Sequence, residues 1–132
     1  MSRRDARIRR CRPEPLTPAE VAALIDGCSL RAPTGVRNRA LLTLLYRSGL
    51  RIGEALALKP ASVRLDDHSI RLLDTKTGQP QTRGFHPSAS DALAHWLDVR
   101  RTLGLKNGLL FCTLDGGRLS DRYVRDLLRR RC

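Results

Sequence analysis

Residues 44–65 read LLYRSGLRIGEALALKPASVRL, and this stretch contains the change of periodicity that decides the fold. The apolar residues before Gly49 recur at helical spacing, and this glycine suits the left-handed turn that ends a helix. A short helix is predicted over 52–58, because the residue before Pro60 disfavours helical backbone angles. From Ser62 onwards apolar and polar residues alternate, which is typical of a half-buried strand.

The segment before this stretch favours helices. Thr17 is followed by Pro18 and, three residues after the threonine, by Glu20, which is the pattern of a helix start with a capping box. A second helix is predicted over 36–48, where the leucines form an apolar stripe. The residues before Leu16 show no periodicity, and we expect them to form a linker or arm.

The segment after this stretch favours a small sheet followed by helices. The predicted elements are, in order, strands over 63–65, 69–73 and 81–85, a helix over 88–103 capped by Ser88 or Ser90, a short apolar segment over 109–113, and a last helix opened by Ser120, in which Val124, Leu127 and Leu128 face inward. The sequence therefore predicts an α+β fold that is mainly helical and contains a small three-stranded antiparallel sheet.

The charge of the chain is high and unevenly placed. Its 132 residues include 25 lysines and arginines against 13 aspartates and glutamates, a formal charge of +12. Residues 1–12 hold six arginines against one aspartate, and residues 118–132 hold six against two. Because guanidinium groups bind phosphate bidentately, the expected partner is a polyanion. The alternative is that the arginines reflect genome composition and form solvated ends. The candidate phosphate contacts at the two ends are Arg7, Arg9, Arg10, Arg12, Arg122 and Arg125.

Several classes of protein are disfavoured by the composition. No apolar run approaches the roughly 18 residues that span a bilayer, and the arginine-rich start lacks the apolar core of a signal peptide. No metal is expected, because the four cysteines lie far apart without a C-x-x-C pair. No cofactor or small-molecule substrate is expected either, since carboxylate clusters and phosphate-binding loops are lacking. A reducing, cytoplasmic compartment fits best.

The opening stretch resembles the first active-site segment of the tyrosine recombinases, the phage integrase family. In that family a helix ends at TGLR or SGLR and the arginine enters the catalytic pocket; Arg51 matches this arginine. Glu54 stands where the family places an acidic residue, and it can orient Arg51 from one helical turn away. A bidentate arginine fork suits two oxygens of a phosphodiester. The alternative is an ordinary surface pair of Arg51 and Glu54.

A second resemblance lies in LLDTKTGQPQTRGFHP, residues 72–87. The family carries a catalytic lysine in the turn between the second and third strands, and Lys76 matches it. The resemblance implies that this lysine protonates the leaving 5′ oxygen. The alternative is an exposed turn lysine without that role. Arg83 matches the basic residue that follows and is a further candidate DNA contact, while GFHP replaces the usual xVPL.

The later active-site residues of the family have no match in this chain. The H-x-L-R-H segment and the tyrosine nucleophile would follow LLRRRC at the end of the sequence. His68 and Arg71 form an H-x-x-R pattern, but it does not match the family segment, because it lies in the predicted hairpin and precedes Lys76. Tyr46, for which a packing role is expected, and Tyr123 do not match the nucleophile either. Strand cleavage by this chain alone is therefore not expected.

The resemblance implies a domain division and a function. Residues 1–15 correspond to a basic interdomain linker or arm, and residues 16–132 to a truncated catalytic domain. The complete enzyme would exchange DNA strands through a 3′-phosphotyrosine, without metal or nucleotide, on double-stranded DNA in a bacterial or phage nucleoid and together with other protomers. One alternative is a catalytically dead DNA-binding module or a decayed mobile-element remnant. A small RNA-binding protein is a weaker alternative, because the few aromatic residues form no stacking motif.

Overall fold

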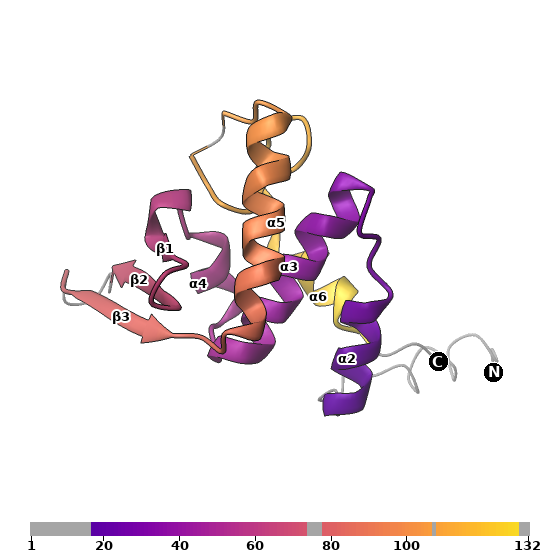
Figure 1. Cartoon of the computed structure of the whole chain (residues 1–132), viewed down its shortest axis with the longest axis horizontal. Helices are drawn as coiled ribbons and strands as arrows, with labels where there is room; N and C mark the ends of the chain where they lie inside the picture. Colours follow the sequence, from indigo (N-terminus) through magenta and orange to yellow (C-terminus); the bar gives the residue numbers. More distant parts are fainter. Residues whose placement is uncertain (1–16, 74–77, 107, 130–132) are drawn as a thin grey trace, which may run out of the picture.

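The computed structural model describes residues 17–73, 78–106 and 108–129, and it confirms the α+β class (Figure 1). Three strands pair antiparallel in the order β1-β2-β3, on one side of the helices. The elements are α2 (Pro18–Asp26), α3 (Pro33–Ser48), α4 (Ile52–Leu56), the 3-10 turn η1 (Pro60–Ser62), β1 (Val63–Arg64), β2 (Ser69–Leu73), β3 (Pro80–Gly84), α5 (Ser88–Thr102) and α6 (Asp121–Leu127).

The core lies between α3 and α5, the two longest helices. Eight of the sixteen residues of α3 are buried, and Leu41 and Leu44 pack in one cluster with Leu93 and Trp96 of α5. The indole Nε1–H of Trp96 donates to the carbonyl of Leu110 over 2.8 Å, so its one polar atom is satisfied in the interior. Burial of each such side chain stabilises the fold by about 1.5–3 kcal/mol.

Helix α2 begins as predicted but packs less deeply than the others. Thr17 Oγ1 accepts from the Glu20 amide over 3.2 Å, and Glu20 Oε1 accepts from the Thr17 amide over 2.9 Å, which confirms the capping box. No residue of α2 is fully buried, and its apolar side chains, among them Leu24 and Ile25, are half-buried. The helix lies on the side of α3 away from the sheet (Figure 1).

Two helix boundaries differ from the prediction by two or three residues, and α5 ends at Thr102, one residue before its predicted end. Helix α3 begins at Pro33, three residues earlier than predicted, because proline suits the first helical position and the Ser29 hydroxyl accepts from the preceding Ala32 amide over 2.9 Å. Helix α4 ends at Leu56, two residues earlier than predicted, and its end leads into η1.

The predicted serine cap of α5 is wrong. Pro87 occupies the cap position and makes no capping bond, while the first amide of the helix, that of Ser88, donates to His86 Nδ1 over 3.1 Å. Both serines instead contact histidine rings: the Ser88 hydroxyl lies 2.9 Å from His86 Nδ1, and the Ser90 hydroxyl lies 2.7 Å from His68 Nδ1. Because these hydroxyl groups contact the imidazole rings, they do not cap the helix.

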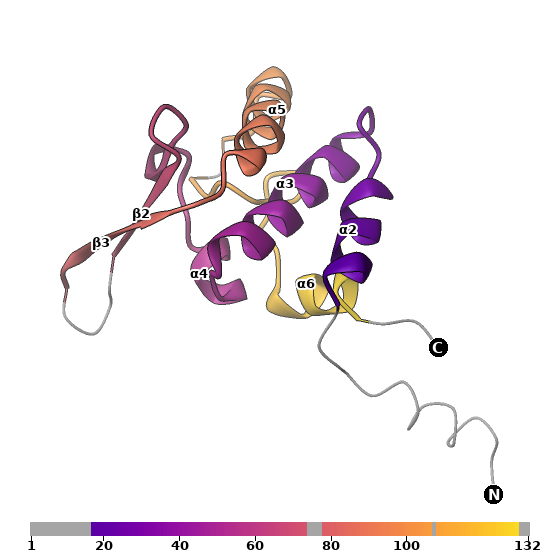
Figure 2. The same ribbon diagram turned by 60° about the horizontal axis from the view of Figure 1, so that its bottom comes forward.

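The sheet projects from the helical part of the molecule (Figure 2). Strand β1 is one residue shorter than predicted, and β3 is shifted one residue towards the N-terminus, so that it begins at Pro80. An edge strand tolerates proline, because a backbone N–H that faces solvent makes no hydrogen bond to a neighbouring strand and can be missing without loss. Ile70 pairs with Arg83 across β2 and β3, which places both side chains on the face that meets the helices.

The C-terminal part returns to the core. Residues 110–112 are fully buried, and the Ser120 hydroxyl caps α6 by accepting from the Tyr123 amide over 3.1 Å, as predicted. On α6 Val124 is buried, while Leu127 and Leu128 are only half-buried. Within the described residues no helix is long and apolar enough to cross a membrane.

Candidate nucleic-acid interface

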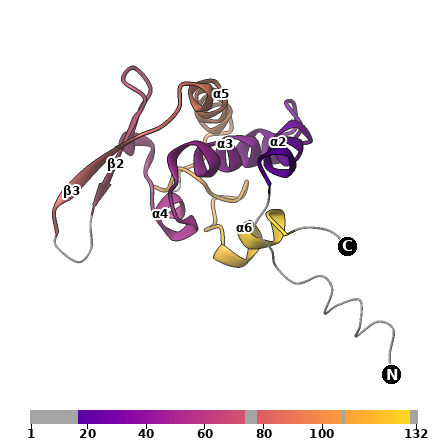
Figure 3. The same ribbon diagram turned by 90° about the horizontal axis from the view of Figure 1, so that it is seen from below.

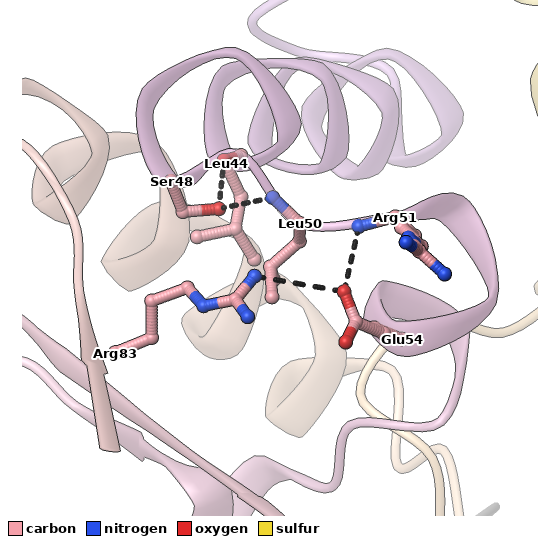
Figure 4. Close-up of polar contacts among 6 residues, drawn as sticks. All are labelled: Leu44, Ser48, Leu50, Arg51, Glu54 and Arg83. Carbon is pink, nitrogen blue, oxygen red and sulfur yellow. Dashed lines mark hydrogen bonds and ion pairs between the residues drawn. The ribbon is translucent and has the colours of Figure 1, made fainter. Parts of the chain in front are cut away.

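The turn between α3 and α4 presents Arg51 to the surface (Figure 4). Gly49 adopts φ 71°, the left-handed conformation that ends α3. The Ser48 hydroxyl donates to the Leu44 carbonyl over 2.6 Å and accepts from the Leu50 amide over 3.3 Å, so the turn is held on both sides. The Leu50 side chain is buried, and the next residue, Arg51, is exposed at the N-cap of α4.

The Glu54 carboxylate holds the start of α4. Its Oε1 accepts from the Arg51 amide over 2.9 Å and lies 3.6 Å from Nη1 of Arg83, which reaches over from β3 (Figure 4). The bond that would complete a capping box does not form, because an arginine side chain has no acceptor. The Glu54 carboxylate contacts the backbone of Arg51, and the Arg51 guanidinium points away from Arg83, so the role of Glu54 in orienting the Arg51 side chain stays a prediction.

A cleft of about 1120 Å³ lies between α4, η1 and the sheet. Arg51, Lys59 and Arg83 line it together with one acidic residue, Glu54. Arg71 also borders the cleft, but strand alternation places its side chain on the face opposite Arg83, whose partner across the strands is Ile70. The cleft therefore has an excess of positive charge among the groups that line it.

The other predicted DNA-contacting residues lie apart from this cleft or outside the described part. Arg122 and Arg125 are exposed on α6, which contacts α4 (Figure 3), and Arg125 Nη2 lies 3.6 Å from the Asp121 carboxylate. Arg7, Arg9, Arg10 and Arg12 of the arm and Lys76 of the β2–β3 connection lie outside the described residues. The structure thus brings together Arg51, Glu54 and Arg83 of the predicted site.

The histidine and tyrosine side chains lie away from this cleft. His68 is in the turn before β2, with φ 53°, and Arg71 is in β2, as the sequence predicted. Tyr46 is 39% exposed and lies beneath the Arg47 guanidinium at 4.9 Å, so the packing role expected for it is wrong. Tyr123 is half-buried, accepts hydrogen bonds from Arg37 and Asn38, and does not line the cleft.

The sequence did not predict the buried polar cluster around Arg37. Arg37 is 4% exposed and donates to the Cys112 carbonyl over 3.1 Å, to the Asn38 side chain over 3.0 Å and to the Tyr123 hydroxyl over 2.9 Å. These bonds tie α3 to the C-terminal segment and α6. The available signal was spacing, because Arg37 lies four residues before Leu41 and on the same helix face.

Two titrating groups outside the cleft have shifted pKa values. Burial raises the pKa of the Cys28 thiol, with a smaller opposing effect of Arg39, so this cysteine is a weak nucleophile at neutral pH. Hydrogen bonds from the Thr113 hydroxyl and the Gly117 amide lower the pKa of Asp115. Among residues 17–73, 78–106 and 108–129, no group of three or more potential ligands is placed to hold a metal ion.

Known proteins resemble this chain over most of its length. The model of the phage integrase family matches residues 14–132. The tyrosine recombinase XerD of Ralstonia nicotianae is 36% identical over 121 residues, which are 89% of this chain and 39% of that protein. The tyrosine recombinase XerC of Actinobacillus succinogenes is 33% identical over 112 residues, 85% of this chain and 37% of that protein. The chain thus spans less than half the length of these relatives.

Solved structures share the fold. The crystal structure of XerA recombinase matches with a TM-score of 0.72 and 24% identity, covering 87% of this chain and 39% of that one. The XerH site-specific recombinase, bound to its difH substrate before cleavage, matches with a TM-score of 0.68 and 26% identity, over 89% of this chain and 38% of that one. With an SGLR turn that exposes Arg51 beside Glu54 and a family match from residue 14 to the last residue, the chain belongs to the phage integrase family of tyrosine recombinases.

Proposed function

We propose that this chain is the DNA-binding first part of a tyrosine recombinase catalytic domain and that it carries one wall of the phosphate site. The observation that supports this most is the placement of Arg51. It is exposed directly after the buried Leu50, at the start of α4, in a cleft that Lys59 and Arg83 also line. Two rigid elements fix its backbone and leave its guanidinium available to solvent.

Arg51 is proposed to bind a phosphodiester of duplex DNA. A guanidinium fork donates two parallel hydrogen bonds to the two non-bridging oxygens, and these bonds strengthen as negative charge develops on phosphorus. Glu54 supports this role through the Arg51 amide, because the hydrogen bond of 2.9 Å fixes the backbone from which the side chain extends. Arg83, Arg122 and Arg125 are proposed as further phosphate contacts, and Arg7, Arg9, Arg10 and Arg12 of a linker over 1–15 as contacts between domains.

Lys76 is proposed as the general acid of the complete enzyme. In that reaction a tyrosine oxygen attacks phosphorus, the bond to the 5′ oxygen breaks, and the lysine supplies the proton that this oxygen takes up. The 3′-phosphotyrosine keeps the energy of the broken bond, so the reverse attack by a 5′ hydroxyl rejoins the strand without metal or nucleotide. Neither tyrosine among the described residues lines the cleft, so we propose that this chain binds DNA and supplies Arg51 and Lys76 to the reaction of a complete recombinase. Its place of action would be the nucleoid of a bacterium or the genome of a phage, with other protomers on the same DNA.

Salt-dependent binding of a fluorescent duplex, followed by anisotropy, tests the role of Arg51. Arg51→Ala should weaken binding and reduce the magnitude of the log–log salt slope by about 0.9, because one phosphate contact is lost. Arg101→Ala is the matched control, since Arg101 is an exposed arginine on α5 that pairs with Asp98 at 2.9 Å and does not line the cleft. An equal loss in both variants would show that binding depends on total charge and would contradict the proposal.

The second candidate, a DNA-binding module without catalysis, is favoured by the hydrogen bonds that the half-buried Tyr123 makes within the protein. Its hydroxyl accepts from Arg37 over 2.9 Å and from Asn38 over 3.1 Å, so it is not presented to an incoming phosphate. A nicked suicide duplex, which traps covalent protein–DNA adducts, separates the candidates. We expect no adduct from this chain alone; an adduct that is lost in Tyr123→Phe or in Tyr46→Phe would contradict that expectation.

A further inference from the structure

The carboxylate of Glu54 serves two groups on different elements. Its Oε1 accepts from the Arg51 amide over 2.9 Å and lies 3.6 Å from Nη1 of Arg83. The Glu54 and Arg83 side chains are 38% and 36% exposed, so this ion pair is open to competition from solvent and from other anions. Glu54 Oε1 is therefore an anionic oxygen that faces the Arg83 guanidinium.

Arg83 is directed at Glu54 by the sheet. It pairs with Ile70, whose side chain is fully buried, and cross-strand partners project from the same face. Arg83 thus faces the helices from the edge strand β3. Figure 4 shows its guanidinium extended towards Glu54, and both residues line the cleft with Arg51.

We propose that Glu54 competes with DNA phosphate for Arg83. In the free protein the carboxylate neutralises Arg83. When the backbone of a duplex enters the cleft, the guanidinium exchanges the carboxylate for a phosphodiester oxygen, while Glu54 keeps its hydrogen bond to the Arg51 amide. DNA that does not reach into the cleft makes no contact with Arg83, so Arg83 does not add to its affinity. This inference rests on the proposed function, because it assigns a control of affinity to the same cleft.

A double-mutant cycle on duplex binding tests the competition. The four proteins are the unchanged chain, Glu54→Gln, Arg83→Ala and the double variant, compared at equal salt. Glutamine retains an oxygen that accepts from the Arg51 amide, so the start of α4 is preserved while the charge is removed. Glu54→Asp keeps the charge but withdraws the carboxylate from Arg83 by one methylene, and it is the second variant if the glutamine variant fails to fold. Asp98→Asn is the control, because it releases an exposed arginine on α5, outside the cleft.

The competition predicts a gain that depends on Arg83. Glu54→Gln should bind duplex DNA about 3-fold more tightly than the unchanged chain, which is the range expected for release from an exposed pair. In the Arg83→Ala background the same change should alter affinity by less than about 1.5-fold. In the Glu54→Gln background, loss of Arg83 should also lower the magnitude of the salt slope by about 0.9.

Three outcomes distinguish failure of the competition from failure of the proposed function. If Glu54→Gln gives the same gain with and without Arg83, or if Asp98→Asn gives an equal gain, the effect is general electrostatics and the competition is overturned. If the unchanged chain does not bind duplex DNA in a salt-sensitive way, the proposed function fails first. Binding that is intact in the unchanged chain but insensitive to Glu54→Gln overturns the competition alone.

Discussion

Two arginines of one helix–turn segment, Arg37 and Arg51, are used in opposite ways. Arg37 is buried on α3, and its guanidinium donates hydrogen bonds to Cys112, Asn38 and Tyr123. Arg51 is exposed fourteen residues later, and its guanidinium points away from the one carboxylate that holds its backbone. A guanidinium whose donors are bonded in the interior is not available for an external anion, whereas a solvated one is.

The same contrast separates the whole helical core from the cleft. Half of α3 is buried, whereas on β3 only Arg83 is even partly buried and the other four residues are exposed. Stability should therefore respond to substitutions in the core, and DNA affinity to substitutions in the cleft. Each experiment below tests whether these two effects are separable.

The largest effect on stability is expected from Trp96. Trp96→Ala removes a fully buried indole from the contact of α5 with α3 and should lower the free energy of unfolding by about 3–5 kcal/mol. Urea denaturation followed by far-UV circular dichroism measures it, since the variant has no tryptophan to fluoresce. Leu103→Ala, at a position 44% exposed, is the control and should change stability by less than about 0.5 kcal/mol. Similar losses in both variants would mean that α5 is not packed as described.

A smaller loss is expected from the buried arginine. Arg37→Ala should cost about 3 kcal/mol, because the Cys112 carbonyl and the Tyr123 hydroxyl lose a charged donor in the interior. Arg37→Lys should recover only part of this, since an ammonium cannot reproduce the planar fork. Below the unfolding transition the salt slope of duplex binding should stay unchanged in both variants. A reduced slope in the folded protein would place Arg37 among the phosphate contacts and remove the contrast with Arg51.

The smallest effect is expected at the turn that joins the two regions. Gly49→Ala should destabilise by about 1 kcal/mol, because φ 71° is strained for a residue with a Cβ. Gly53→Ala is the matched control: it lies within α4, has open space around its Cβ position, and should be neutral or stabilising by up to about 1 kcal/mol. Thermal unfolding of both variants measures the difference. Equal shifts in Tm would contradict a left-handed turn at Gly49.

Local patterns in the sequence predicted most of the fold. The capping box at Thr17, the left-handed Gly49 and the hairpin of β1 and β2 depend on residues a few positions apart, and they lie where they were expected. The predicted serine cap of α5 is wrong because the hydroxyl groups of Ser88 and Ser90 contact the rings of His86 and His68. The contact of Ser90 with His68, 22 residues away, is decided by tertiary packing, which periodicity does not record, whereas the contact of Ser88 with His86 is local.

The site was predicted less completely than the fold. The resemblance identified Arg51 and Glu54, and the structure places both in one cleft. The contact of Glu54 with Arg83 joins residues 29 positions apart, and only the register of β2 with β3 brings them together. The role assigned to Lys76 stays a prediction, because this residue lies outside the described part.

The most direct test of the claim that phosphate enters the cleft beside α4 is an NMR titration with duplex DNA. It follows the ¹⁵N-resolved Nε–Hε signals of the arginines. Guanidinium groups that bind phosphate should shift and become protected from exchange, and Arg51 and Arg83 are expected to respond together. Arg101 on α5 should stay unchanged, as should the buried Arg37. A titration in which other arginines respond while Arg51 does not would contradict the account.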